Sequence, residues 1–298
     1  MRTLFFITGA LICFAGNAQN QAGGKKSGAG GGTEKKINFS GTWQGILTQP
    51  NGGLDDNYAF WISFKQTKDS LKGLSRLEVN NTNNFGILEL KGAVNGNELT
   101  VKETKITDEN IKRGASWCIK KYTLVYNEAD GSLSGEWIAP NKCGPGKIYL
   151  YRTDNAFSTE QQLSPIYLSY DDFKLNLKEG KKVSGNKIII PDMNFEQGKW
   201  DLNDVAKKRL DDFAGLLKMH SKLTVKILGH TDNAGDDFPN LTLSLNRAKA
   251  MVNYLKSKGI NAKRLQYEAF GEARPVRENT NENGRIKNRR MEFEVVKE

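Results

Sequence analysis

The sequence predicts two folded domains of different class, an all-β domain followed by an α/β domain. Between residues 37 and 152, short segments rich in β-branched and aromatic residues are separated by turns of Gly, Asn and Asp. Between residues 186 and 298, strand-like segments with a two-residue period alternate with segments of helical periodicity. The length of 298 residues accommodates both domains, an N-terminal leader and connecting segments.

The N-terminus, residues 1–18, has the pattern of a secretory signal peptide. Arg2 precedes an apolar run over residues 4–15, and the small residues of Gly16-Asn17-Ala18 end the segment. The run is too short for a helix that spans a bilayer. We expect Cys13 to belong to the discarded segment, because Ile12 stands where a lipidation signal requires a small residue; the sequence leaves open whether Cys13 is ever lipidated. We therefore expect an exported protein.

Residues 19–36 consist mainly of Gly, Lys and other small or polar residues. Because such a segment has almost no apolar side chain to bury, we expect a solvated, flexible linker. Its glycine-rich run over residues 28–32 follows no strand and precedes no Gly-Lys-Ser/Thr sequence, which argues against a phosphate-binding loop.

Eight strand segments are expected between residues 37 and 152, which predicts either a closed barrel or a two-sheet sandwich. The sequence Gly41-Thr42-Trp43 after Phe39 resembles, over this one short motif, the first strand of lipocalin-like barrels. Aromatic residues in strands are usually core residues, so a core position is favoured over a ligand cavity for Trp43, Trp61, Trp117 and Trp137. The strand segments cover residues 46–47, 58–64, 74–79, 85–90, 99–101, 122–126, 133–138 and 148–151.

Cys118 and Cys143 remain in the exported chain, where an oxidising environment predicts a disulfide between them. Cysteine-based catalysis is a poor alternative, because His220 and His230 are the chain's two histidines. The same scarcity of histidine, without a cluster at ligand spacing, argues against a metal site. Residues 153–185 have mixed composition, and we expect a connector whose one or two short strands pack on either domain.

The C-terminal domain, residues 186–298, is expected to place helices on a sheet. Strands are predicted at 223–227, 265–269 and 291–295, and residues 272–288 are expected to form a long loop. An amphipathic helix is predicted over residues 201–219, with one face formed by Leu202, Val205, Leu210, Phe213, Leu216 and Leu217.

A second helix is predicted after the strand at 223–227, with Ser244 or Thr242 as its N-cap and Gly259 as its terminating residue. Arg247 is then close to the start of this helix. The positive end of the helix dipole disfavours a cation there by a few tenths of a kcal/mol, unless an anion is bound.

Asp232 lies in the loop before this helix and offers the opposite charge to Arg247. Together the two residues can hold a ligand that bears both an ammonium and a carboxylate group, such as an amino acid or its derivative. On the charge pattern alone, the simpler alternatives are favoured. Asp232 and Arg247 then pair directly with each other, or Asp232 caps the turn while Arg247 lies along the surface.

Several short motifs follow one another through this domain in a fixed order and spacing. They are Phe195-Glu196-Gln197-Gly198, Gly229-His230-Thr231-Asp232-Asn233-Ala234-Gly235, Asn240, Leu243-Ser244, Arg247-Ala248, Tyr254-Leu255, Gly259-Ile260, Gly271, Pro275, Asn288-Arg289-Arg290 and Glu292. Through these motifs, residues 186–297 resemble the OmpA-like peptidoglycan-binding domain family.

The resemblance implies a non-catalytic domain that binds diaminopimelate of the peptidoglycan stem peptide, whose free end carries an ammonium and a carboxylate. It implies that Asp232 binds the ammonium, that Arg247 binds the carboxylate and that Arg289 reinforces the anion side. Asn240 would bridge through its amide, which both donates and accepts. Glu196 stands where the family often has aspartate, so a carboxylate is kept there. The implied location is the periplasm of a Gram-negative bacterium, at the outer membrane or cell wall.

The formal charge of +10 is spread through the chain, and no nucleic-acid-binding fold accompanies it. A basic surface suits the anionic cell envelope, so we expect no nucleic-acid partner. Neither Gly-x-Ser-x-Gly nor His-Glu-x-x-His occurs in the sequence, and we expect no catalysis and no cofactor.

Two hypotheses remain. In the first, the C-terminal domain docks on peptidoglycan while the β domain engages an outer-membrane or periplasmic protein. In the second, the β domain is a lipocalin-like carrier or an enzyme, and the C-terminal domain localises it. A pocket with convergent polar groups in the β domain favours the second hypothesis, and a filled aromatic core favours the first. The sequence leaves open the partner of the β domain and the oligomeric state.

Overall fold

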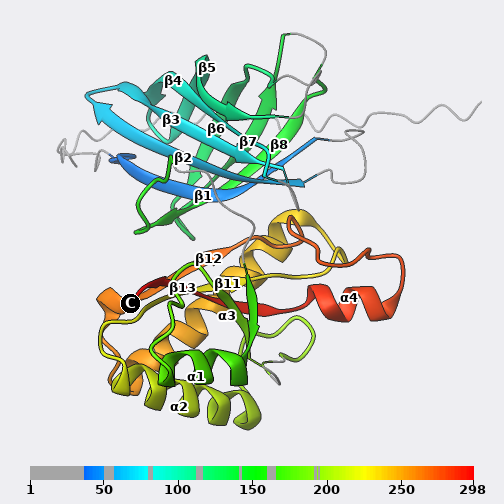
Figure 1. Cartoon of the computed structure of the whole chain (residues 1–298). Coiled ribbons are helices and arrows are strands. Elements are labelled where there is room, and N and C mark those ends of the chain that lie inside the picture. Colours follow the sequence, from blue (N-terminus) through cyan, green and yellow to red (C-terminus); the bar gives the residue numbers. More distant parts are fainter. Residues whose placement is uncertain are drawn as a thin grey trace, which may run out of the picture. The chain divides into compact units, whose positions relative to one another are not determined.

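The computed structural model describes residues 37–298 except 50–56, 80–82, 112–116, 141–142, 160–165, 191–192 and 194. The predicted signal peptide and the Gly/Lys-rich linker lie outside these residues. The described chain contains a closed eight-stranded β-barrel and a five-stranded sheet with helices (Figure 1). This confirms the predicted fold class and decides for a barrel over a sandwich.

Each barrel strand is antiparallel to its neighbours, and the last strand closes on the first. All eight expected strand segments are observed. The strands are β1 Gly41–Thr48, β2 Asn57–Thr67, β3 Ser70–Glu78, β4 Phe85–Asn95, β5 Glu98–Asn110, β6 Lys121–Asn127, β7 Ser132–Ile138 and β8 Gly146–Thr153.

The barrel interior is a packed aromatic and aliphatic core. Trp43, Phe60, Tyr122 and Trp137 are almost completely buried in it. The indole of Trp137 donates to the Thr48 carbonyl at 2.9 Å, so its polar atom is satisfied. Packing rather than an open lumen therefore accounts for these large side chains.

The other two tryptophans of this domain have different environments. Trp117 is partly buried against the barrel core. Trp61 is also buried, but in a small separate cluster with Ala59, Leu228 and Phe270. The core interpretation thus applies to Trp43, Trp137 and Trp117, whereas Trp61 packs outside the barrel core.

A buried carboxylate inside the barrel is fully engaged by neighbouring groups. Glu103 accepts hydrogen bonds from the Ser75 hydroxyl at 2.7 Å, the Tyr122 hydroxyl at 2.5 Å and the Lys120 backbone amide at 2.8 Å. The Lys120 ammonium is 3.6 Å from the same carboxylate and donates to the Cys118 carbonyl. Burial, with the nearby Glu103 charge, raises the pKa of Tyr122 well above 10.0. This cluster is a saturated structural network.

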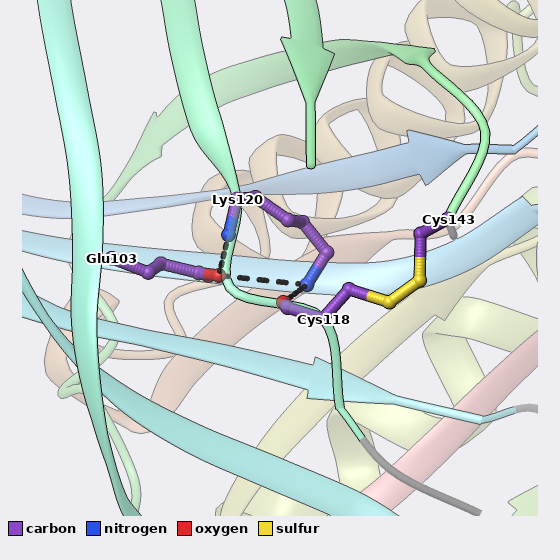
Figure 2. The surroundings of a disulfide bond; sticks show 4 residues. All are labelled: Glu103, Cys118, Lys120 and Cys143. Atoms are coloured by element: carbon purple, nitrogen blue, oxygen red, sulfur yellow. Dashed lines mark hydrogen bonds and ion pairs between the residues drawn. A yellow bond between two sulfur atoms is a disulfide. The ribbon is translucent and has the colours of Figure 1, made fainter. Parts of the chain in front are cut away.

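The predicted disulfide between Cys118 and Cys143 is present, with a Cα–Cα distance of 6.4 Å. Figure 2 shows it beside Glu103 and Lys120. The disulfide and the buried polar cluster therefore both fix the segment that directly precedes β6.

The C-terminal sheet has the strand order β12-β11-β13-β10-β9. Strands β11 and β12 are parallel, as are β9 and β10, while β13 is antiparallel to both of its neighbours. The elements are β9 Tyr167–Ser169, α1 Tyr170–Lys178, β10 Lys187–Ile189, α2 Asp204–Met219, β11 Thr224–Gly229, α3 Asp237–Ser257, η1 Ala262–Arg264, β12 Leu265–Ala269, α4 Glu282–Asn288 and β13 Met291–Lys297.

Helices α1, α2 and α3 share one core with the sheet (Figure 1). Phe173 of α1 and Phe213 of α2 are fully buried in it, together with Ile227 of β11 and Phe293 of β13. The region expected as a connector thus supplies β9 and α1 to the C-terminal domain, because Tyr170 and Phe173 pack into this core.

Two details of the first amphipathic helix differ from expectation. Helix α2 begins at Asp204, after the N-cap Asn203, whose side chain accepts from the Ala206 amide at 2.8 Å. Val205, expected on the buried face, is 55% exposed. With 3.6 residues per turn, a position five residues before the buried Leu210 falls on a different face of the helix.

The expected loop over residues 272–288 contains helix α4, which sequence periodicity did not indicate. The Asn281 side chain caps it by accepting from the Gly284 amide at 2.9 Å. Gly284 is required by close packing, because a Cβ there would lie 2.0 Å from the Glu278 carbonyl oxygen. Helix α4 therefore depends on a polar N-cap and on the close contact at Gly284, and it has no apolar stripe.

Residues 37–298 form one compact unit, and side chains of the barrel's outer face contact the C-terminal domain. The Tyr151 hydroxyl accepts from the Ala269 amide at 2.7 Å, and Glu78 pairs with Arg274. No helix in the described part of the chain is both long and apolar enough to cross a membrane.

Replacing both cysteines, Cys118→Ser with Cys143→Ser, should lower the free energy of unfolding by about 3 kcal/mol, because the disulfide closes a loop of intermediate length. Chemical denaturation followed by tryptophan fluorescence measures this loss. A reducing agent should destabilise the wild-type protein and leave the double variant unchanged. Equal stability of the oxidised and reduced wild-type proteins would contradict the expectation.

Candidate functional site

The candidate site begins where β11 ends. Gly229 closes this strand against α3, and a Cβ there would lie 2.3 Å from the Ser244 carbonyl oxygen. The next two residues are held by the backbone: the His230 amide donates to the Arg290 carbonyl and the Thr231 amide to the Gly271 carbonyl. These contacts fix the chain direction at the position where Asp232 follows.

Asp232 is buried, with 9% of its side chain exposed. Its Oδ1 accepts from the Ala234 amide at 3.1 Å, which closes a short turn. Its Oδ2 is 2.5 Å from the Arg289 guanidinium. Asp232 therefore forms its ion pair with Arg289, from the Asn-Arg-Arg motif, and not with Arg247.

Arg289 is the more exposed member of this pair, with 37% of its side chain accessible. One of its terminal nitrogens binds Asp232, and the other lies 2.6 Å from Glu282 of α4. The two carboxylates raise the pKa of Arg289 through hydrogen bonds and charge. Helix α4 thus contributes a carboxylate that holds Arg289 beside Asp232.

Arg247 lies well inside α3, which corrects the expectation that it is near the helix start. The helix begins at Asp237, and Thr242 and Ser244 are helical residues rather than caps. Pro239 does not prevent this early start, because the first turn of a helix needs no backbone donor at that position. The dipole argument for an anion therefore does not apply to Arg247.

A different argument for an anion arises from the surroundings of Arg247. The residue is only 5% exposed, and its guanidinium donates to the backbone carbonyls of Lys199 at 2.9 Å and Glu196 at 3.2 Å. It also lies over the Phe195 ring, 4.9 Å from the centroid. Within the described residues, Arg247 has no carboxylate in ion-pair contact.

Burial lowers the pKa of Arg247 to about 10, while the charge of Asp232 raises it and that of Arg289 lowers it further. The three side chains are thus close enough to interact electrostatically, and they carry one negative and two positive charges. Two neutral carbonyl partners leave most of the five N–H donors of Arg247 for other acceptors. The arrangement is therefore suited to binding an anion next to a carboxylate.

Asn240, in the first turns of α3, stabilises the loop that bears Asp232. Its Nδ2 donates to the carbonyls of Asp232 and Ala234, at 3.3 and 3.2 Å, and to the Glu272 carboxylate at 2.9 Å. All of these bonds use the amide nitrogen, so the carbonyl oxygen of the amide is the atom that remains for a ligand.

Glu196 is placed differently from the other candidates. Its side chain is 70% exposed and its carboxylate lies 2.6 Å from the Lys199 ammonium. Its backbone carbonyl accepts from Arg247. The structure thus brings Asp232, Arg289, Asn240 and Arg247 together, while the Glu196 carboxylate pairs with a surface lysine.

Asn288 is a supporting residue whose role the sequence alone did not reveal. Its Oδ1 accepts from the backbone amides of Val276 and Arg277, and its Nδ2 donates to the Arg277 carbonyl and to Asn279. The side chain is fully buried. Asn288 therefore fixes the segment before α4 next to the residue that precedes Arg289. In the sequence, the Asn-Arg-Arg motif was the signal that pointed to Asn288.

A second buried polar group lies behind the loop. The His230 side chain is 1% exposed, neither ring nitrogen has a hydrogen-bond partner among the described residues, and Nε2 is 3.8 Å from Glu292. Glu292 is also buried and is surrounded by Arg290 at 2.7 Å and Lys187 at 3.1 Å. The histidine stacks on Phe270, with 5.3 Å between ring centroids.

These surroundings shift both pKa values downward. Burial lowers the pKa of His230 well below 6.5, and Arg290 contributes in the same direction. Burial alone would raise the pKa of Glu292, but the positive charges around it, including Arg290 and Lys187, lower it well below 4.5. The favoured state is thus a neutral histidine beside an ionised carboxylate.

Among the residues that the structure describes, no group of three or more His, Cys, Asp or Glu side chains is arranged to hold a metal ion.

Comparison with known proteins places this domain in a family. The family model described as OmpA family matches residues 194–289. The peptidoglycan-associated lipoprotein of Buchnera aphidicola subsp. Baizongia pistaciae is 32% identical over 150 residues, which are 50% of this chain and 82% of that protein. The chain belongs to the OmpA family.

Other relatives share the same region. The probable lipoprotein YiaD of Escherichia coli K12 is 30% identical over 113 residues, and the chain spans about half of it, 52%. Outer membrane protein A of Bordetella avium is 34% identical over 120 residues, or 62% of its length. A solved structure, the cell wall anchor of the T6SS from Pseudomonas aeruginosa, has 26% identity and a TM-score of 0.35, and covers 42% of this chain and 94% of that one.

The buried His230–Glu292 pair predicts a loss of stability in acid. Below about pH 6.5 the unfolded chain binds a proton that folded His230 does not, so the free energy of unfolding falls as the pH decreases. Glu292 stabilises the fold above its ordinary pKa of 4.5, and this contribution is lost at lower pH.

Urea unfolding at pH 7.5, 5.5 and 4, with hydrogen exchange of the β11 and β13 amides as the readout, measures both effects. His230→Gln removes the titrating ring, so the loss between pH 7.5 and 5.5 should shrink while the loss below pH 4.5 remains. The same pH dependence in the variant and the wild type would refute the assignment to His230.

Proposed function

We propose that this chain is a non-catalytic envelope protein whose C-terminal domain binds peptidoglycan through diaminopimelate of the stem peptide. The name of one relative, a peptidoglycan-associated lipoprotein, agrees with such a role. The observation that carries the proposal is the charge arrangement: a buried arginine without a carboxylate partner in the described chain lies near a buried aspartate.

The two-signed end of diaminopimelate complements this arrangement. Its carboxylate would bind Arg247, which then gains the anion that its backbone partners do not supply. Its ammonium would bind Asp232. Because Arg289 already contacts Oδ2 of Asp232, the ammonium would share this carboxylate. The N–H donors of Arg289 that Asp232 and Glu282 do not use would reinforce binding of the ligand carboxylate.

The two remaining candidates have supporting roles in this proposal. Asn240 fixes the Asp232 turn through its amide nitrogen and offers its amide oxygen to the ligand ammonium. Glu196 acts through its backbone carbonyl, which orients Arg247, rather than through its exposed carboxylate.

The barrel is proposed to engage an outer-membrane or periplasmic partner, so that the whole protein anchors that partner to the cell wall. The barrel core is filled by Trp43, Phe60, Tyr122 and Trp137, and the polar cluster at Glu103 is saturated by its own neighbours. Both features favour this role over a lipocalin-like carrier or an enzyme. The proposed location is the periplasm, at the outer membrane and cell wall, after cleavage of the signal peptide.

The proposal predicts that Asp232→Asn and Arg247→Gln each weaken binding to diaminopimelate-containing sacculi at least tenfold, because a charge-assisted contact contributes about 1.5–3 kcal/mol. Co-sedimentation of the full-length protein measures the change. Asp204→Asn and Lys256→Gln, which alter exposed charges of α2 and α3 by the same amounts, serve as matched controls. Undiminished sedimentation of an Asp232→Asn/Arg247→Gln protein that remains folded would reject the proposed site.

Cell walls that carry lysine in place of diaminopimelate provide a complementary test. Lysine keeps the ammonium but lacks the adjacent carboxylate, so Arg247 gains no partner and binding should fall at least tenfold. Equal sedimentation with both kinds of wall would exclude recognition of the zwitterion.

A further inference from the structure

The barrel covers the free edge of the C-terminal sheet. Strand β12 is an edge strand, which pairs with β11 on its other side. The Phe270 amide, directly after β12, donates to the last carbonyl of β11, so the Ala269 amide one residue earlier points to the free edge. There it donates to the Tyr151 hydroxyl of β8 at 2.7 Å, and the Tyr267 carbonyl accepts from the Asn155 side chain at 3.1 Å. Side chains of β8 and of the segment after it thus pair with backbone groups that an edge strand otherwise leaves open.

The Tyr151 hydroxyl makes this contact specific. Besides accepting from Ala269, it donates to the side-chain oxygen of Gln44 in β1 at 2.6 Å, and both Tyr151 and Gln44 are buried. Burial, with the nearby Glu268 charge, raises the pKa of Tyr151 well above 10.0, so the hydroxyl keeps the proton that it donates. A buried hydroxyl with both a donor and an acceptor defines one geometry of contact between the barrel and β12.

Apolar contacts extend from the edge strand to helix α3. Ile46 of β1 is completely buried, in a cluster with Leu241 and Leu245 of α3. Tyr149 of β8 stacks on Phe238, in the first turn of α3, with 5.0 Å between ring centroids. The barrel therefore packs on the N-terminal half of the helix that follows the loop with the candidate ligand-binding aspartate.

Residues 269–274, which we call the bridging segment, are held against the barrel by aromatic and charged contacts. Phe270 is completely buried in a cluster with Trp61 of β2. The Arg274 guanidinium lies over the rings of Phe270 and Trp61, 4.0 and 5.6 Å from their centroids. Arg274 also pairs with Glu78 of β3. Strands β2 and β3 thus contact this segment in addition to β8.

The other side of the bridging segment supports the ligand loop. The Gly271 carbonyl accepts from the Thr231 amide at 2.8 Å, one residue before Asp232. The Glu272 carboxylate accepts from the side-chain nitrogen of Asn240 at 2.9 Å, and the same nitrogen donates to the Asp232 carbonyl. The bridging segment is thus bonded to the barrel through some of its residues and to the Asp232 turn through the residues next to them.

The Phe270 ring joins the two sides directly. It meets Trp61 edge-on, with 6.2 Å between ring centroids, and it stacks on His230 at 5.3 Å. His230 is two residues before Asp232 and is almost completely buried. Because buried side chains are close-packed, loss of Trp61 from one side of this ring removes support from the other side.

We propose that the barrel is a positioning element of the peptidoglycan site. Its contacts through Ile46, Trp61 and Tyr151 hold the bridging segment and α3. These in turn hold Asp232 and Asn240 in the arrangement that binds the ligand. The coupling is reciprocal, because a ligand that prefers the docked state also stabilises that state. The inference rests on the proposed function, since the ligand is the proposed diaminopimelate. A barrel that is merely tethered to the C-terminal domain is the alternative.

Undocking the barrel without unfolding it tests this coupling. Ile46→Glu places a charge in the apolar contact with α3, where it is costly to bury, whereas water solvates the charge once the outer face of the barrel is released. Calorimetric titration of the full-length protein with meso-diaminopimelate should give an affinity about tenfold lower for this variant, a usual size of coupling between two sites. Ile138→Glu, the same change at an exposed position on β7, is the matched control and should keep the wild-type affinity.

The Ala269 amide reports docking at a single residue, because its hydrogen-bond acceptor belongs to the barrel. Its hydrogen exchange should be faster in Ile46→Glu and in Tyr151→Phe, which removes only the hydroxyl and keeps the ring. By reciprocity, saturating meso-diaminopimelate should slow this exchange in the wild-type protein by about the same tenfold factor. A purely structural role of the interface predicts no effect of the ligand at Ala269.

Faster Ala269 exchange in Ile46→Glu together with wild-type affinity for meso-diaminopimelate would overturn the positioning role and leave the proposed function standing. Unchanged Ala269 exchange in both the Ile46→Glu and Tyr151→Phe variants, or no effect of the bound ligand on this exchange in the wild-type protein, would also overturn it. Absence of meso-diaminopimelate binding by the wild-type protein would overturn the proposed function and this inference with it.

Discussion

The candidate binding site depends on the buried charge of Arg247, which no carboxylate of the described chain contacts. Asp232 and Glu282 both pair with Arg289, whereas Arg247 is held by backbone carbonyls that carry no formal charge. Removing a guanidinium from water is unfavourable unless hydrogen bonds and an anion compensate for the lost solvation. The described chain supplies the hydrogen bonds but only part of the compensating charge. A ligand carboxylate at this position would complete it, and this is the physical reason to regard the cluster as a binding site.

Most of the surrounding structure serves to hold these few atoms in place. Gly229 allows β11 to pack tightly on α3, which sets the distance between the Asp232 loop and the helix that carries Arg247. Asn240 and Asn288 stabilise the loops on either side with hydrogen bonds from their amides. Because hydrogen bonds fix geometry as well as energy, a ligand meets a preorganised site and little free energy is spent on ordering the loops.

The sequence predicted the fold class and most elements, because strands and helices that bury one face have apolar residues at periodic spacing. The charge pattern and the family resemblance also predicted Asp232, Asn240, Arg247 and Arg289 as site residues, and the structure places these residues near one another. The sequence misplaced the start of α3, since Asp236 and Pro239 resemble a loop although both are acceptable at a helix N-terminus. It could not reveal that Asp232 pairs with Arg289 or that α4 supplies Glu282, because these contacts join segments 50 or more residues apart or depend on a helix without apolar periodicity.

Whether Arg247 binds the ligand carboxylate can be tested by an NMR titration that follows the side-chain Nε–Hε resonances of the arginines in the full-length protein. With meso-diaminopimelate, we expect saturable shifts of the Arg247 and Arg289 resonances. The Arg264 resonance should be unaffected, because its guanidinium is bonded to backbone carbonyls distant from Asp232. 1,5-Diaminopentane, which carries ammonium groups but no carboxylate, should not reproduce the Arg247 shift. Saturable binding of diaminopimelate that leaves the Arg247 resonance unmoved would contradict the claim.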